Sequence, residues 1–186
     1  MPYLKPATDA PFGLAPHTVP LRIGTYTKAT TTNLFAGGIV ILDSAGEVVP
    51  LATLTGVNNL VVGVAAETTL SASAGTTVQV YDHPDQLFVC QEDSVGTALS
   101  QTLVGNVFQA TGLTPGTAAQ FTRGRSITQL DTSTGVATAI GASMLQLVKM
   151  HEIEGTTMPT GTGDPRKVVV KFLAGTHFYA TQSGAI

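Results

Sequence analysis

Proline is concentrated at the start of this chain: five of its ten prolines, at positions 2, 6, 11, 16 and 20, fall within the first 20 of 186 residues. Because proline fixes φ and lacks a backbone N–H, this segment cannot form a helix or a central strand. Four large apolar side chains lie between the prolines: Tyr3, Leu4, Phe12 and Leu14. The sequence predicts an extended arm over 1–20 that rests on its own body or on a neighbouring subunit; the alternative is a disordered terminus.

The rest of the chain is poor in charge. Charged residues make up 11% of the sequence, against a usual value of about 25%. Threonine is abundant, and it favours strands because its branched β-carbon fits a pleated surface while its hydroxyl faces water. A chain of 186 residues can also bury one core without disulfides. This composition predicts an all-β protein with part of its surface covered in use.

Short β-branched runs recur along the sequence, with turn signals between them. They fall at 21–27, 38–42, 47–51, 60–65, 77–81, 87–91, 126–131, 144–150 and 167–173. Strands of about five residues at such intervals predict a β-barrel or sandwich of short antiparallel strands with little helix. The predicted organisation is the arm 1–20 followed by a single β-rich domain over 21–186, with a subdivision near 83–112 left open.

Three local features carry specific predictions. Asp43–Gly46 separates two apolar runs and predicts a hairpin turn. Gly63 interrupts a β-branched run, which indicates a bulge or a close backbone approach. Asp82–Asp85 reads as a turn in which Asp82 caps backbone N–H groups.

Other stretches are less clearly patterned. Residues 95–104 fit a short helix or a loop with a strand, and 111–120 is rich in turn residues. The triplet His177–Tyr179 is expected to extend the last strand. No helical period of useful length is present in the sequence.

Few residues suggest catalysis. Cys90 lies in an apolar run and is expected to be a buried, inert thiol rather than the partner of His83. The cluster of Asp82, His83 and Asp85 is more typical of a turn than of a metal site. We therefore expect no catalytic residue, no bound cofactor and no metal. A hydrolase site around His83, Asp85 and Cys90 is the weakest alternative.

Charge also limits the classes of partner. The net charge is −3, and the nine Lys and Arg residues are scattered rather than gathered into a basic stripe. Nucleic-acid binding, which needs concentrated positive charge, is not expected. No apolar run is long enough to span a bilayer, and no secretion signal is evident, so we expect no membrane partner.

Several segments together resemble one protein family. They are Phe12–Pro16, Asn33–Gly37 with the following Ile39-Val-Ile, Gly56–Val64, Tyr81–Gln91 and Gly124–Asp131. The most specific is Tyr81–Gln91, with the sequence YDHPDQLFVCQ. In these segments the chain resembles the small capsid cement, or decoration, proteins of tailed bacteriophages. It departs from their pattern at Phe88–Cys90, where the family usually carries more charge.

The resemblance implies a non-enzymatic virion protein. Such a protein binds the outer face of an icosahedral head, contacts the major capsid protein and itself as a dimer or trimer, and is assembled in the host cytoplasm. Tyr3, Leu4, Phe12 and Leu14 are the predicted partner-contacting residues of the arm. Two alternatives stay open: a tail, fibre or adaptor protein of the same particle, and a non-catalytic ligand-binding β module.

Overall fold

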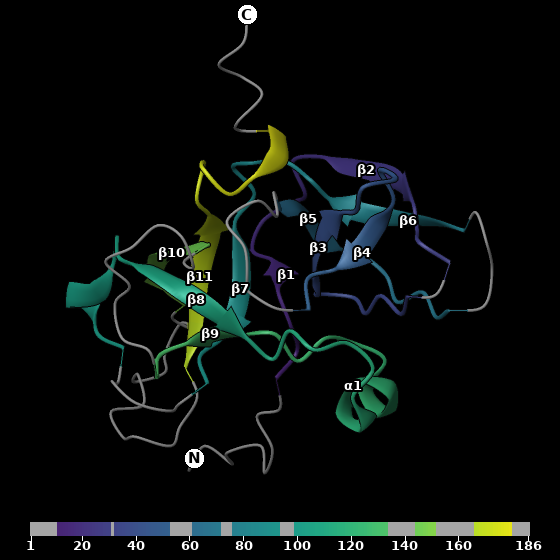
Figure 1. Ribbon diagram of the computed structural model, residues 1–186. Coiled ribbons are helices and arrows are strands. Elements are labelled where there is room, and N and C mark those ends of the chain that lie inside the picture. Colours follow the sequence, from purple (N-terminus) through teal and green to yellow (C-terminus); the bar gives the residue numbers. More distant parts are fainter. Residues whose placement is uncertain are drawn as a thin grey trace, which may run out of the picture.

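The computed structural model describes residues 11–30, 32–52, 61–71, 76–93, 99–133, 144–151 and 166–179. Within these ranges the chain is all-β, as predicted: its strands form two antiparallel sheets, and helix is limited to two short elements and a helical turn that begins at Phe178 (Figure 1). The strands are β1 Ala15–Pro16, β2 Ile23–Thr27, β3 Ile39–Leu42, β4 Val48–Pro50, β5 Val61–Ala65, β6 Thr77–Tyr81, β7 Phe88–Gln91, β8 Val107–Thr111, β9 Gln129–Asp131, β10 Leu145–Met150 and β11 Lys167–Phe172. The helices are η1 Gln101–Leu103 and α1 Ala118–Arg123.

The five-stranded sheet has the order β2-β6-β5-β3-β4 and lies at the right of Figure 1. It curls until its two ends meet: Lys28, just after β2, forms a bridge with Val48 of β4, and the Ala29 N–H donates to the Val48 carbonyl at 3.2 Å. The curled sheet encloses its own apolar cluster, which includes Val62, Val78 and Val80.

The six-stranded sheet has the order β1-β7-β11-β10-β8-β9 and lies at the left of Figure 1. It also curls, because the Asp93 N–H, just beyond β7, donates to the Leu130 carbonyl of β9 at 3.0 Å. Its interior holds Phe88, Phe108 and Phe172 among other apolar residues. Each sheet is therefore a partly closed roll, and the described residues form two apolar clusters.

Strand β5 connects the two clusters because both of its faces are buried. Val61 and Val64 belong to the larger cluster, whereas Val62 and Ala65 belong to the smaller one. A register shift against β3 at Gly63 changes the side-chain alternation within β5. A Cβ on Gly63 would collide with the Tyr81 carbonyl oxygen. Both predictions for Gly63, a bulge and a close backbone approach, are confirmed.

The predicted hairpin is also confirmed. β3 and β4 pair antiparallel around the turn, where Asp43 Oδ1 accepts hydrogen bonds from the N–H groups of Ala45 and Glu47, both at 2.9 Å. Gly46 completes the turn with φ +77°, a conformation that costs little only for glycine. The aspartate and glycine of this sequence thus fix the turn geometry.

Helix α1 begins inside 111–120, the stretch predicted to be rich in turn residues, and runs three residues beyond it. Thr117 and Gln120 form a reciprocal capping box at its first turn, and Gly124 ends it in the left-handed conformation with φ +64°. A helix of six residues is too short to show an apolar period, so only its caps mark it in the sequence. The other less clearly patterned stretch, as far as it is described, contains η1.

The final prediction for the strands was wrong: His177–Tyr179 does not extend β11. A turn closed by the Thr176 N–H and the Leu173 carbonyl, 2.9 Å apart, redirects the chain. His177 then forms a parallel bridge with Val61, and the Thr176 carbonyl accepts the Val61 N–H at 2.7 Å. The end of the described chain therefore binds β5 of the other sheet.

Candidate interaction surface

The described part of the N-terminal arm is attached to the body of the protein. Leu14 is only 2% exposed and belongs to the larger apolar cluster. Its N–H donates to the Gly37 carbonyl at 2.9 Å, next to Gly13, whose φ of +75° allows this close approach. Phe12 is partly buried, with the Lys167 ammonium 5.8 Å from its ring centre. The sequence left two surfaces open for the arm, its own body and a neighbouring subunit. Leu14 packs on its own body.

The arm then becomes the outermost strand of the six-stranded sheet. Ala15 and Pro16 pair with Val89 and Phe88 of β7, and the His17 N–H donates to the Leu87 carbonyl at 2.9 Å. An edge is the position in which a sheet tolerates proline. Tyr3 and Leu4, the other two predicted contact residues, lie outside the described residues. That these four side chains contact a partner stays a prediction.

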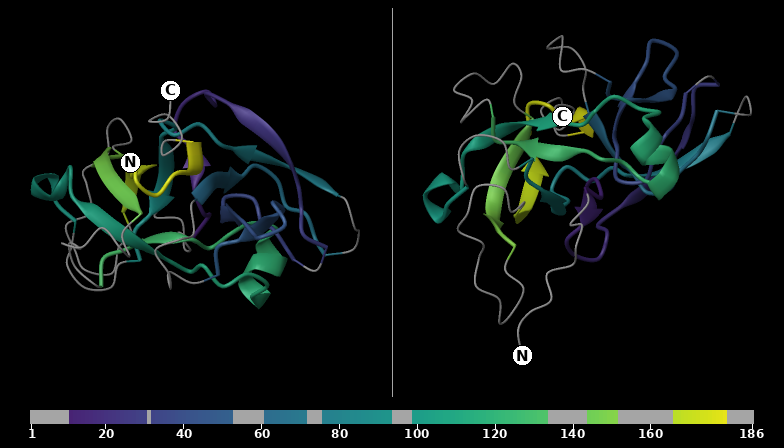
Figure 2. Two further views of the ribbon diagram at one scale, coloured as in Figure 1. Left: turned by 45° about the horizontal axis from the view of Figure 1, so that its top comes forward. Right: turned by 90° about the horizontal axis from the view of Figure 1, so that it is seen from below.

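The arm continues into a row of exposed side chains. Val19, Leu21 and Ile23 are 83%, 56% and 47% exposed, and Thr25 and Thr27 continue the exposed positions of β2. We call these five residues the outward row. β2 lies at the edge of the five-stranded sheet and at the outer margin of the molecule in the left view of Figure 2 (purple). Apolar side chains gathered at such a place are candidates for contact with another molecule.

Polar contacts with a buried carboxylate hold β2 in place. Asp82, which is 2% exposed, accepts hydrogen bonds from Arg22 Nε at 2.7 Å and from the Tyr26 hydroxyl at 2.5 Å. The hydrogen bond to Asp82 raises the pKa of Arg22. The pKa of Tyr26 is also raised, mainly by burial and secondly by its hydrogen bond to Asp82. The predicted capping role of Asp82 is corrected: its carboxylate turns toward β2, and the turn is closed by the Gln86 N–H and the His83 carbonyl.

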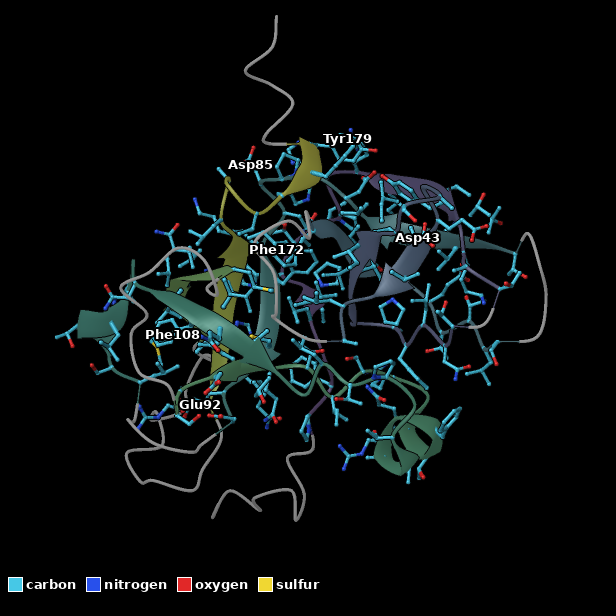
Figure 3. The ribbon with its side chains drawn as sticks, in the orientation of Figure 1. Asp43, Asp85, Glu92, Phe108, Phe172 and Tyr179 are labelled. Carbon is cyan, nitrogen blue, oxygen red and sulfur yellow. The ribbon has the colours of Figure 1, made fainter. Side chains whose placement is uncertain are left out.

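The end of the described chain adds to this polar cluster. The hydroxyls of Tyr26 and Tyr179 are 2.7 Å apart, and the Arg22 guanidinium lies 4.2 Å from the centre of the Tyr179 ring. Figure 3 shows Tyr179 beside β2, far from Glu92 at the opposite end of the protein. His177, 1% exposed, accepts the Tyr179 N–H through Nδ1, and burial lowers its pKa to about 4. We call Arg22, Tyr26, Asp82, His177 and Tyr179 the Asp82 cluster.

A second buried polar pair was not anticipated. Glu92 and Arg166 are 3% and 8% exposed, with Glu92 Oε1 accepting the Arg166 N–H at 3.1 Å and lying 3.7 Å from its Nε. The Arg166 guanidinium also donates to the Leu99 carbonyl. Burial raises the pKa of Glu92. This pair joins the end of β7 to the start of β11.

The candidate chemical groups do not come together as a site. Cys90 is fully buried in the larger apolar cluster, and burial raises its pKa to about 12, so the thiol is not activated. His83 Nδ1 accepts the Asp85 N–H at 3.1 Å within the turn. The described residues contain no group of three or more His, Cys, Asp or Glu suited to a metal ion. Nor is any helix among them long and apolar enough to cross a membrane.

The outward row could have been found from the sequence, because apolar residues at 19, 21 and 23 alternate as they do along one face of a strand. Alternation alone does not say whether that face is buried, and the polar partner of the opposite face, Asp82, is 60 residues from Arg22. Comparisons with protein-family models, curated proteins and solved structures found no match for this chain.

Proposed function

We propose that this protein is a decoration subunit of a viral capsid. It binds the outer face of an icosahedral head and stabilises contacts between major capsid proteins. The observation that carries the proposal is the outward row: three exposed apolar side chains followed by two exposed threonines, without a charge, leading along β2, whose other face contacts the Asp82 cluster. The resemblance of the sequence to capsid cement proteins of tailed bacteriophages is the reason for proposing a viral head as the partner.

The physical chemistry of the row suits attachment to a lattice. Burial of apolar surface contributes about 25 cal/mol per Å², so a narrow row of three apolar side chains gives a modest affinity for a single contact. Many copies on one shell add their contacts, and avidity makes the assembly stable. Because β2 is held in place, little conformational entropy is lost when the row is covered.

Binding to undecorated heads tests the proposal. Purified protein is mixed with heads that lack it, and the bound copies per head are counted after sedimentation. We expect saturable binding and a rise in the temperature at which the heads open. The absence of binding, with heads shown to be intact, would refute the proposed function.

Matched variants show whether the outward row makes the contact. Ile23→Lys places a charge at a position that is 47% exposed, and Leu70→Lys does the same at a 50% exposed position outside the row. We expect the Ile23 variant to bind heads at least about tenfold more weakly, since an unpaired charge would be desolvated in the interface. The Leu70 variant should bind like the natural protein. Equal binding by both variants would place the contact elsewhere.

The arm needs a separate test. Removing residues 1–20 would take away Leu14 and β1, so a loss of binding would only report damage to the fold. Removing residues 1–10 eliminates Tyr3 and Leu4 and keeps the described strand. If these two side chains are partner anchors, this truncation weakens head binding and leaves the free energy of unfolding unchanged. Unaltered head binding would contradict the anchor prediction.

A further inference from the structure

The free edge of β2 carries unpaired backbone groups in a defined pattern. β2 pairs with β6 in continuous register from Ile23–Tyr81 to Thr27–Thr77, and just beyond it the Lys28 N–H donates to the Thr76 carbonyl at 2.9 Å. In an antiparallel pair, hydrogen-bonded and non-hydrogen-bonded residues alternate. The even-numbered residues therefore bond to β6, and the N–H and C=O groups of Ile23, Thr25 and Thr27 point to the free edge.

No described strand pairs with this edge between Ile23 and Thr27. The structure gives the N–H groups of Ile23, Thr25 and Thr27 no partner among the described residues. The free segment is bounded on one side by Arg22, which is held by Asp82, and on the other by the bridge from Lys28 to Val48. Five residues are thus open to pairing, and none of the five is charged or a proline. Natural sheets usually protect their edges with such residues.

We propose that β2 pairs antiparallel with β2 of a second copy of this chain, around a twofold axis at Thr25. This proposal rests on the proposed function, because the family resemblance behind that function also implies self-association. Around that axis Thr25 meets Thr25 of the second copy, and Ile23 meets its Thr27. All three edge residues then form reciprocal pairs, and each pair exchanges both N–H···O bonds.

The second copy is favoured because the edge complements itself. Both strands are uncharged over Ile23–Thr27, so no like charges face each other within the five-residue ladder. The flanking pair is Arg22 and Lys28 of the second copy, but Arg22 is bound to Asp82, and the buried Lys28 ammonium donates to carbonyls of its own chain. The odd-numbered side chains form one row on the outer face, and the twofold axis joins the rows of the two copies into a continuous apolar and hydroxyl-bearing strip. A five-residue ladder is small compared with the roughly 1,200 Å² that a standard interface buries, so we expect a weak dimer in solution.

Cross-linking through Thr25 tests the geometry directly. The only natural cysteine, Cys90, is fully buried, so a cysteine introduced at the surface reports on its own. In the proposed pair the two Thr25 Cα atoms lie about 5.5 Å apart, within disulfide reach. We expect Thr25→Cys to form dimers under mild oxidation at least about tenfold faster than Leu70→Cys. Equal rates for the two variants would overturn the proposal.

A backbone variant distinguishes this strand pairing from non-specific association of exposed apolar surface. Thr25→Pro removes an N–H that points to the free edge and makes no ladder bond to β6, whereas Thr25→Val keeps that N–H. In sedimentation equilibrium from micromolar to millimolar protein, we expect the valine variant to dimerise like the natural chain. The proline variant should dimerise at least about tenfold more weakly, with its folded signal retained by circular dichroism.

The failure of this proposal and that of the proposed function are distinguishable. A natural chain that stays monomeric up to millimolar concentration overturns the pairing, whatever happens with heads. If that monomer still binds heads and the proline variant does not, a strand of another protein occupies the edge in place of a second copy. A natural chain that dimerises through Thr25 yet never binds heads supports the pairing and refutes the decoration role.

Discussion

The first two strands of the chain, β1 and β2, both lie at sheet edges, but the two edges differ in character. β1 contains two residues, one of them Pro16, and is followed by a backbone contact from His17 to the Leu87 carbonyl. β2 contains five residues without a proline or a charge, and three of its side chains are exposed. One edge is short and blocked, whereas the other is long and open.

The two edges differ because the composition of the chain changes at Pro20, from a proline-rich segment to one without proline. Before Pro20, prolines limit hydrogen bonding, and Leu14 anchors the segment to the core. After Pro20, β-branched and small residues form a full strand, and Asp82 binds Tyr26 within it and Arg22 just before it. The blocked edge thus serves the fold, and the open edge is available for association.

The largest effect is expected where the blocked edge is anchored. Leu14→Ala removes a side chain that is 2% exposed in the larger apolar cluster and leaves a cavity. We expect the free energy of unfolding to fall by about 3 kcal/mol. Urea denaturation measured by circular dichroism gives this value.

Phe12→Ala is the matched control because Phe12 lies on the same arm but is only partly buried. It should cost clearly less than Leu14→Ala. If both substitutions cost less than about 0.5 kcal/mol, the arm is not anchored as described, and the contrast between the two edges disappears.

A smaller loss is expected when the support of the open edge is weakened. Asp82→Asn keeps the shape of the side chain but removes the negative charge that holds Arg22 and Tyr26. We expect the free energy of unfolding to fall by about 2 kcal/mol, since charge-assisted hydrogen bonds contribute roughly 1.5–3 kcal/mol. Tyr26→Phe, which removes one hydroxyl, should cost about 1 kcal/mol. If Asp82→Asn leaves the free energy of unfolding unchanged, β2 is held in place without the cluster.

Every observed strand except β1 and β8 falls within a run predicted from the sequence, because the signals of those runs are local. Alternation in 77–81, the Asp43–Gly46 turn and the glycine at Gly63 each act within a few residues. The sequence also indicates that the proline-rich start cannot enter a sheet centre. The edge position of β1 follows from that limit.

The side-chain partners could not be predicted because they depend on long-range packing. Asp82 looked like a turn cap, and only the fold brings it to Arg22 and Tyr26. Leu14 was predicted to contact a partner, because an apolar side chain on an extended arm suits another molecule as well as it suits the core, where the fold buries it. His177 left its expected strand because a turn at 173–176 directs it to β5.

The Asp82 cluster should also make stability depend on pH. His177 is kept neutral in the folded protein, with a pKa of about 4 against an ordinary value of 6.5. The unfolded chain therefore binds a proton at a higher pH than the folded one, and stability is lost as pH falls from about 6.5 toward 4. Between pH 7 and pH 5.5 we expect a loss of about 1 kcal/mol from this group. His177→Phe should flatten the profile in that range; an unchanged slope would assign the pH dependence to other groups.

The smallest effect on folding is expected on the open edge itself. Leu21→Ser changes a side chain that is 56% exposed and packs in neither apolar cluster. The free energy of unfolding should stay within about 0.5 kcal/mol of the natural value. Association should nonetheless weaken, because the substitution removes apolar surface from the outward row. If Leu21→Ser leaves the free energy of unfolding unchanged but lowers the apparent association constant of the dimer, the open edge serves association and not folding. A loss above 1 kcal/mol would mean that the row belongs to the core of its own chain.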